Sequence, residues 1–372
     1  MHTAIKIPAI ILLLLFPCIG GIASPNLAIV LPDSGIASPN SGITSPNLHG
    51  NLLISNNPQH SPIPVCLNDT TNSDSIEPNR SISLRDLSKV NDSVNRSDSI
   101  DKHLLINISV AVGTIYISTQ AALYFAWYAD YPQSSFHFIN DNNEWLFMDK
   151  MGHFTSSYYI TNIGSELYAQ TGMNRNKSAL IGGLLSLTYL TTVEIFDGFS
   201  AGWGASPGDV VANAAGVGLF LSQQFLWQEQ RIGLKWSYHP TDFAQYRPDL
   251  LGKNGLHSAL KDYNGQTYWI TGNVKSFLHD DSKIPDWLSI AVGYSATGMT
   301  GAVSNPLYFN GIPIPPYERY SQFYLSPDID LTKLNIRNKY LKILLKAVSF
   351  IKIPMPAVEF SKKGLKFYPV YF

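Results

Sequence analysis

The sequence predicts an α+β fold, with an N-terminal helical bundle of about four helices followed by an antiparallel β region. Between residues 104 and 228, long apolar segments are separated by short links, which is typical of an antiparallel helical bundle. After residue 230 the pattern changes, and apolar and polar residues alternate in short runs. Such alternation is typical of strands with one apolar and one polar face.

The first hundred residues carry targeting and low-complexity features. Residues 1–23 resemble a secretory signal peptide, with an apolar run and a small-residue exit at Ala23, where we expect cleavage. Cys18 could instead bear a lipid, but bulky Phe16 and Pro17 precede it and make this the weaker hypothesis. Residues 24–102 contain short Ser-Pro-Asn repeats and many polar residues, and we expect a disordered spacer. If Cys18 is removed, Cys66 is single and no disulfide framework follows.

Four helices are predicted within the bundle, which we place at residues 103–229. The first, residues 104–129, contains no charge and is either a transmembrane helix or the central helix of a large bundle. The second covers residues 144–170 and the third residues 177–197. The fourth runs to residue 228, with Ser206 as N-cap, Pro207 at its first position and Asp209 in the capping-box position.

The β region is predicted at residues 230–372. Alternation marks strands at residues 231–239, 266–274, 287–298, 322–331 and 366–372. Residues 338–353 form a basic amphipathic helix that either lies on a membrane surface or covers the sheet. Terminal Phe372 resembles the end of an outer-membrane β-barrel, but the strands are fewer than the eight that such a barrel needs. A half-buried antiparallel sheet packed on the bundle is therefore favoured.

Three polar pairs at helical spacing interrupt the apolar helices. Charged groups in apolar surroundings must pair, bind an ion or do chemistry, and three successive pairs favour one shared site. Lys150 lies about 100° from its neighbour around the helix and is expected to serve a different surface. The polar cluster predicted from these patterns comprises Asp149, Lys150, His153, Glu194, Asp197, Asp209 and Asn213.

The chemistry of this cluster stays open between two alternatives. Carboxylates with one histidine suit a divalent metal ion, with His153, Asp149 and Glu194 as candidate ligands, or a histidine base. The same residues also suit a buried hydrogen-bond network, in which Asp209 only caps its helix. The sequence contains no nucleophile elbow, phosphate loop, nicotinamide fingerprint or CxxC pair.

Several motifs resemble those of known families. Asp149-Lys-Met-Gly-His-Phe154, Glu194-Ile-Phe-Asp197 and the segment 206–216 resemble the YfiM-like family of uncharacterised bacterial envelope proteins. The resemblance covers residues 104–372 and includes the segment 261–269. More loosely, the same clusters resemble VanZ-like membrane proteins, which are linked to glycopeptide-antibiotic tolerance. The resemblance implies an envelope location and these site residues, and it implies no chemistry.

The leading hypothesis is a membrane-associated cell-envelope protein without enzymatic activity, with membrane lipids as partners. Two alternatives are a metal-dependent hydrolase of a lipid or cell-wall precursor and an outer-membrane β protein with a helical periplasmic part. Charged residues make up 14% of the chain and the net charge is −1, which argues against a nucleic-acid surface.

Overall fold

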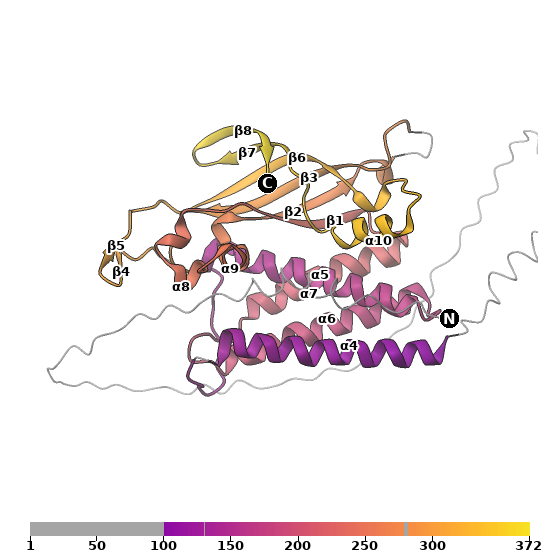
Figure 1. Cartoon of the computed structure of the whole chain (residues 1–372), viewed down its shortest axis with the longest axis horizontal. Helices are drawn as coiled ribbons and strands as arrows, with labels where there is room; N and C mark the ends of the chain where they lie inside the picture. Colours follow the sequence, from indigo (N-terminus) through magenta and orange to yellow (C-terminus); the bar gives the residue numbers. More distant parts are fainter. Residues whose placement is uncertain (1–99, 130, 279–281) are drawn as a thin grey trace, which may run out of the picture. The chain divides into compact units, whose positions relative to one another are not determined.

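The computed structural model describes residues 100–129, 131–278 and 282–372, which belong to one compact unit. The predicted signal peptide and nearly all of the predicted spacer lie outside the described residues. The fold class is confirmed: a helical region is followed by an antiparallel sheet (Figure 1).

Four long helices form the bundle. They are α4 (Lys102–Leu123), α5 (Met148–Ala169), α6 (Arg175–Gly198) and α7 (Pro207–Trp227). A short π-helical turn, Tyr124–Tyr128, extends α4. Helix α5 packs against both α6 and α7 and lies next to the sheet, whereas α4 lies farthest from the sheet (Figure 1).

Glycines allow the helices around α5 to approach closely. A Cβ atom on Gly182 would lie 2.4 Å from the carbonyl oxygen of Thr161, and one on Gly216 would lie 2.2 Å from that of Phe154. Small residues at such crossings are typical of helices that pack without a strong hydrophobic driving force, as in membranes. Polar side chains near the crossings are thereby brought close together.

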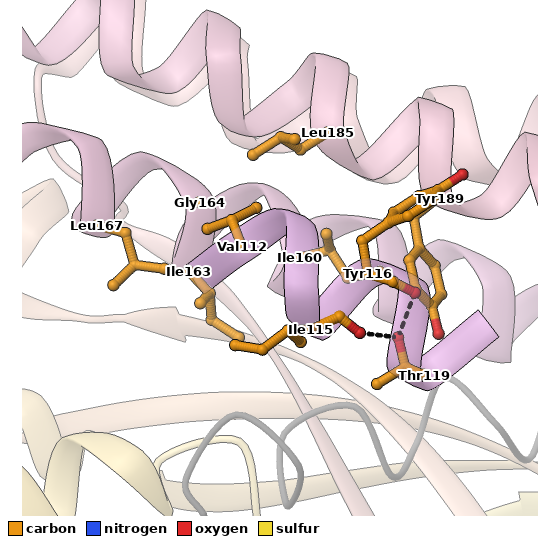
Figure 2. Close-up of a pocket in the computed structure, with 10 residues that line it drawn as sticks. All are labelled: Val112, Ile115, Tyr116, Thr119, Ile160, Ile163, Gly164, Leu167, Leu185 and Tyr189. Carbon is orange, nitrogen blue, oxygen red and sulfur yellow. Dashed lines mark hydrogen bonds between the residues drawn. The ribbon is translucent and has the colours of Figure 1, made fainter. Parts of the chain in front are cut away.

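Helix α4 joins the bundle along an apolar groove and through hydrogen bonds. The side chain of Gln120 donates to the carbonyl oxygen of Tyr189 (2.9 Å), and the hydroxyl groups of Tyr116 and Thr192 lie 2.6 Å apart. Figure 2 shows the groove, lined by residues of α4, α5 and α6, among them Ile115 and Leu185. Helices α4, α6 and α7 are each long and apolar enough to cross a membrane.

The sheet has six strands in the order β1-β2-β3-β6-β7-β8, and every neighbouring pair is antiparallel. The strands are β1 (Ile232–Tyr238), β2 (Gln266–Asn273), β3 (Leu288–Thr297), β6 (Tyr320–Ile329), β7 (Met355–Ser361) and β8 (Gly364–Tyr371). Strand β7 was not predicted. The smaller elements are β4 (Tyr308–Phe309), β5 (Ile312–Pro313), α8 (Pro248–Leu251), α9 (Gly255–Lys261) and α10 (Lys339–Ala347).

One face of the sheet is buried and carries polar side chains together with an aromatic core, and the other face carries exposed apolar side chains on β3 and β6. Ser289 and Asp328 are almost fully buried, while their neighbours along the strands, Ile290, Val292 and Leu325, are each 46–53% exposed. Val292 pairs with Leu325 across β3 and β6, so the apolar surface is continuous between strands. Exposed apolar patches of this kind are expected where a membrane or another protein covers the surface.

Two predicted helix boundaries are wrong, one because of local backbone geometry and one because of a tertiary contact. The second helix begins at Met148 rather than residue 144, because Trp145, Leu146 and Phe147 adopt left-handed φ angles of 48°, 49° and 66°. The basic amphipathic helix ends at Ala347 rather than residue 353. The following residues instead pair with β1, where the Trp236 N–H donates to the carbonyl oxygen of Phe350 (2.8 Å).

Candidate functional site

The structure brings polar residues from α5, α6 and α7 into one buried cluster. All seven side chains named from the sequence are at most 7% exposed. They come from the first two turns of α5, the last turn of α6 and the first two turns of α7. We call this group, together with Asp141 of the preceding loop, the acid-rich cluster: Asp141, Asp149, Lys150, His153, Glu194, Asp197, Asp209 and Asn213.

Lys150 lies inside the cluster, so the expectation that it serves a different surface is wrong. Its Nζ atom lies 2.6 Å from Asp141 Oδ2, 2.9 Å from Asp209 Oδ1 and 3.2 Å from Asp149 Oδ2. The backbone geometry of a helix separates adjacent residues by 100°, but a lysine stem is long enough to carry its ammonium group back to its neighbour's carboxylate.

His153 lies between carboxylates on both sides of its ring. Its Nδ1 atom is 3.1 Å from Asn213 Oδ1 and 3.8 Å from Glu194 Oε1. Its Nε2 atom faces Asp209 Oδ1 at 3.9 Å. The helical spacings of four in α5 and in α7 therefore place both members of each pair on the face that contacts the other helix.

Glu194 caps the start of α7. Its Oε2 atom accepts a hydrogen bond from the Ser206 N–H (2.9 Å), and the Ser206 hydroxyl oxygen accepts one from the Asp209 N–H (3.2 Å). Ser206 is thus the N-cap, as predicted. The predicted capping-box role of Asp209 is wrong, because Glu194 occupies that position and the Asp209 carboxylate turns to Lys150.

Asp197 lies at the edge of the cluster, where the Tyr128 hydroxyl donates to its Oδ1 atom (2.8 Å). This contact joins the cluster to the π-helical turn that follows α4. A buried carboxyl group needs hydrogen-bond donors, and Tyr128 supplies one to Asp197. Asp197 can therefore be buried at the end of its helix, where contact with solvent would otherwise be expected.

Sequence reasoning missed two residues at the site, Asp141 and Tyr263. Asp141 contacts Lys150 and accepts a hydrogen bond from the Ser206 hydroxyl (2.6 Å), and Tyr263 donates to Asp149 Oδ1 (2.8 Å). Asp141 follows no helical period because it lies in a loop, and Tyr263 is more than a hundred residues away in the chain. The only signal for Tyr263 was its place in the segment 261–269 that carries the family resemblance.

Two carboxyl groups that precede α5, Asp141 of the cluster and the nearby Glu144, have pKa values shifted in opposite directions. Burial alone would raise the pKa of Asp141, but hydrogen bonds from Lys150 and Ser206 hold this pKa below its ordinary value. Burial raises the pKa of Glu144 to about 7, and the charges of Asp141 and Asp149 add to the rise. The loop therefore places one strongly paired acid and one weakly paired acid beside the bundle.

The cluster contains more acids than bases. Five carboxyl groups face Lys150 and His153 in a region with little water. Asp149, His153 and Asp209 each offer a ligand atom, and these atoms all lie within 4.8 Å of one another. Glu194, which the sequence analysis named as a metal ligand, lies instead on the Nδ1 side of the His153 ring.

One segment of the chain, which contains this site, is similar to a described family of sequences. Residues 137–223 match the family described as "Predicted periplasmic lipoprotein (DUF2279)". No curated protein and no solved structure matches the chain. The matched segment contains the whole acid-rich cluster. The family description is consistent with an uncharacterised cell-envelope domain.

Proposed function

We propose that the protein is a membrane-embedded cell-envelope protein without catalytic activity, in which the acid-rich cluster holds the helical bundle together. One observation carries the proposal: the bundle has its charges inside and its apolar side chains outside. In water this arrangement leaves apolar surface exposed, whereas in a bilayer it satisfies both kinds of side chain.

The exposed apolar residues lie along the three helices that are long enough to cross a membrane. On α4, Ile117 is 69% exposed; on α6, Leu184 is 66% exposed; on α7, Leu226 is 74% exposed. The bilayer hydrocarbon is about 30 Å thick, and a helix of about 20 residues spans it. Lipid chains would cover these faces and the groove of Figure 2.

The acid-rich cluster forms the polar interior of the bundle whose outer faces are apolar. Ion pairs of Lys150 with three carboxylates link the loop before α5, α5 itself and α7, and Glu194 links α6 to α7. In a membrane, apolar side chains contact lipid as favourably as they contact another helix, so polar contacts between helices decide which helices associate. The cluster would thus fix which helices pair and in what register.

The β region and the family description also support a membrane location. The sheet exposes apolar side chains at Ile290, Val292 and Leu325, as described above. The match at residues 137–223 is to a family described as periplasmic lipoproteins, and such proteins lie at a membrane. The choice between inner and outer membrane and the route of export stay predictions.

Cysteine labelling in native membranes tests the proposal. In a Cys66→Ser chain, Leu184→Cys should not react with a membrane-impermeant maleimide until the membrane is dissolved in denaturing detergent. Lys253→Cys, at an exposed polar position, is the matched control and should react at once. Equal and immediate labelling at both positions would contradict the proposal, and the Cys66→Ser parent gives the background.

A further inference from the structure

The histidine of the acid-rich cluster is oriented as a metal ligand would be. Its Nδ1 atom lies 3.1 Å from the Asn213 side-chain oxygen, within hydrogen-bond distance. Nε2, on the other side of the ring, faces Asp209 Oδ1 at 3.9 Å and is the nitrogen that a metal ion would bind. Metal-binding histidines characteristically donate from one ring nitrogen to an oxygen and bind the metal with the other.

A second observation is independent of the ligand atoms. Glu194 is 3% exposed, and its Oε1 atom accepts no hydrogen bond from the residues that the structure describes. This oxygen lies 3.8 Å from Nδ1 of His153. A buried carboxylate oxygen without a donor is costly unless positive charge lies close by. A metal ion bound at Nε2 would make the imidazole ring more positive and would thus place positive charge near Glu194 Oε1.

We propose that the cluster binds one divalent metal ion through Asp149, Asp209 and Nε2 of His153, with Asn213 and Glu194 orienting the histidine. The three ligand groups are buried, and their ligand atoms lie within 4.8 Å of one another. This site goes beyond the proposed function and does not depend on contact with lipid. A metal-free protein would therefore leave the membrane proposal standing.

Lys150 does not exclude a metal ion. Each carboxylate oxygen has two lone pairs, so Asp149 and Asp209 can accept from the Lys150 ammonium and still bind metal with the other lone pair. One ammonium group also leaves most of the carboxylate charge uncompensated. Two carboxylates and one imidazole suit Mn²⁺ or Zn²⁺ better than Ca²⁺, which takes six or more oxygen ligands.

The test uses the full-length protein purified in detergent, stripped with a chelator and then incubated with MnCl₂ or ZnCl₂. After desalting, elemental analysis should find about one ion per chain in the wild type and none in Asp209→Asn. Asn213→Ala, which affects only the orientation of His153, should bind the ion about 10–100-fold more weakly. Thermal unfolding with and without the ion checks that each variant is folded.

The matched control is Asp328→Asn, which removes a buried carboxylate from the sheet instead. This variant should retain the ion at the wild-type level. Absence of retained Mn²⁺ and Zn²⁺ in folded wild-type protein would overturn the proposal. Equal retention in wild type, Asp209→Asn and Asn213→Ala would also overturn it, because the ion would then bind elsewhere.

Discussion

Two buried ionic clusters, one in the bundle and one on the sheet, differ in how their charges balance. On the sheet, Asp328 lies between two ammonium groups, with Lys235 Nζ at 2.7 Å from its Oδ2 atom and Lys352 Nζ at 3.6 Å from its Oδ1 atom. In the bundle, five carboxyl groups share Lys150 and His153. The sheet cluster is rich in base and the bundle cluster is rich in acid.

The lysines of the sheet cluster are also well supplied with acceptors. Lys352 donates to the Ser326 hydroxyl and to the carbonyl oxygens of Pro327 and Ile353 at 3.0–3.2 Å, and Lys235 donates to the carbonyl oxygen of Ile329 (2.7 Å). Because both ammonium groups have oxygen acceptors, the sheet cluster needs no further ligand, which indicates a structural role. The excess acid of the bundle must be compensated by protons or by a bound cation.

Lys150→Met should have the largest effect on stability. The substitution leaves three buried carboxylates without their ammonium partner, and removing one member of a buried ionic group costs roughly 3–5 kcal/mol. We expect a loss of that size in the free energy of unfolding, measured by denaturant titration in detergent. Added Mn²⁺ should restore part of it. A loss below about 1 kcal/mol would mean that the acids are already neutral.

Asp328→Asn should destabilise the sheet cluster by about 3 kcal/mol, because two buried ammonium groups then face each other without a carboxylate. The amide oxygen can still accept the hydrogen bond that Thr271 donates, which keeps the loss below that of Lys150→Met. The same denaturant titration measures it. Divalent ions should not restore the stability of this variant. If Mn²⁺ did restore it, the two clusters would not differ in their response to a cation.

Glu144, which lies beside the acid-rich cluster, should make the stability of the protein depend on pH. Its pKa is raised from 4.5 to about 7, so the folded protein binds more protons than the unfolded chain between these values. Stability should therefore fall as the pH rises from 4.5 to 7, by about 2 kcal/mol after allowance for partial exposure. Glu144→Gln should remove this part of the pH profile. An unchanged pH profile of stability in Glu144→Gln would show that another group causes the pH dependence.

Ser206→Ala should have the smallest effect, a loss of about 1 kcal/mol typical of a removed N-cap. The Ser206 hydroxyl also donates to Asp141, so the variant loses a contact of the acid-rich cluster as well as a cap. Thermal unfolding of the variant beside Ser222→Ala, at an exposed serine within α7, gives the comparison. Equal melting temperatures in the two variants would show that the cap contributes nothing.

Local pattern predicted the helices and the meeting of Asp149, Glu194 and Asn213, because helical spacing places residues on faces before any tertiary contact is known. It did not predict that Lys150 enters the cluster, since the reach of a long side chain is not set by its Cα position. Asp141 was missed for another reason, because it lies in a loop and follows no helical period. Three consecutive left-handed residues, Trp145 to Phe147, separate this loop from the helix.

The orientation of the sheet could not be predicted from its alternation. A period of two gives one apolar and one polar face, but it does not say which face packs on the helices. In the structure the apolar face packs on the helices at β1, where Leu234 lies in one core cluster with Tyr158 and Phe220. Ile290 and Val292 lie on the same face of the sheet and stay about half exposed. How much of the apolar face the helices cover depends on the whole molecule, and the alternation within one strand does not contain it.

The most direct test of the central claim, that lipid covers the apolar outer faces, is a nitroxide label at position 184 of a Cys66→Ser, Leu184→Cys chain. The protein is reconstituted into phospholipid vesicles, and collisions of the label with oxygen and with a water-soluble nickel chelate are compared by electron spin resonance. We predict frequent collisions with oxygen and almost none with nickel. Nickel collisions as frequent as those of a label at position 253 would contradict the claim.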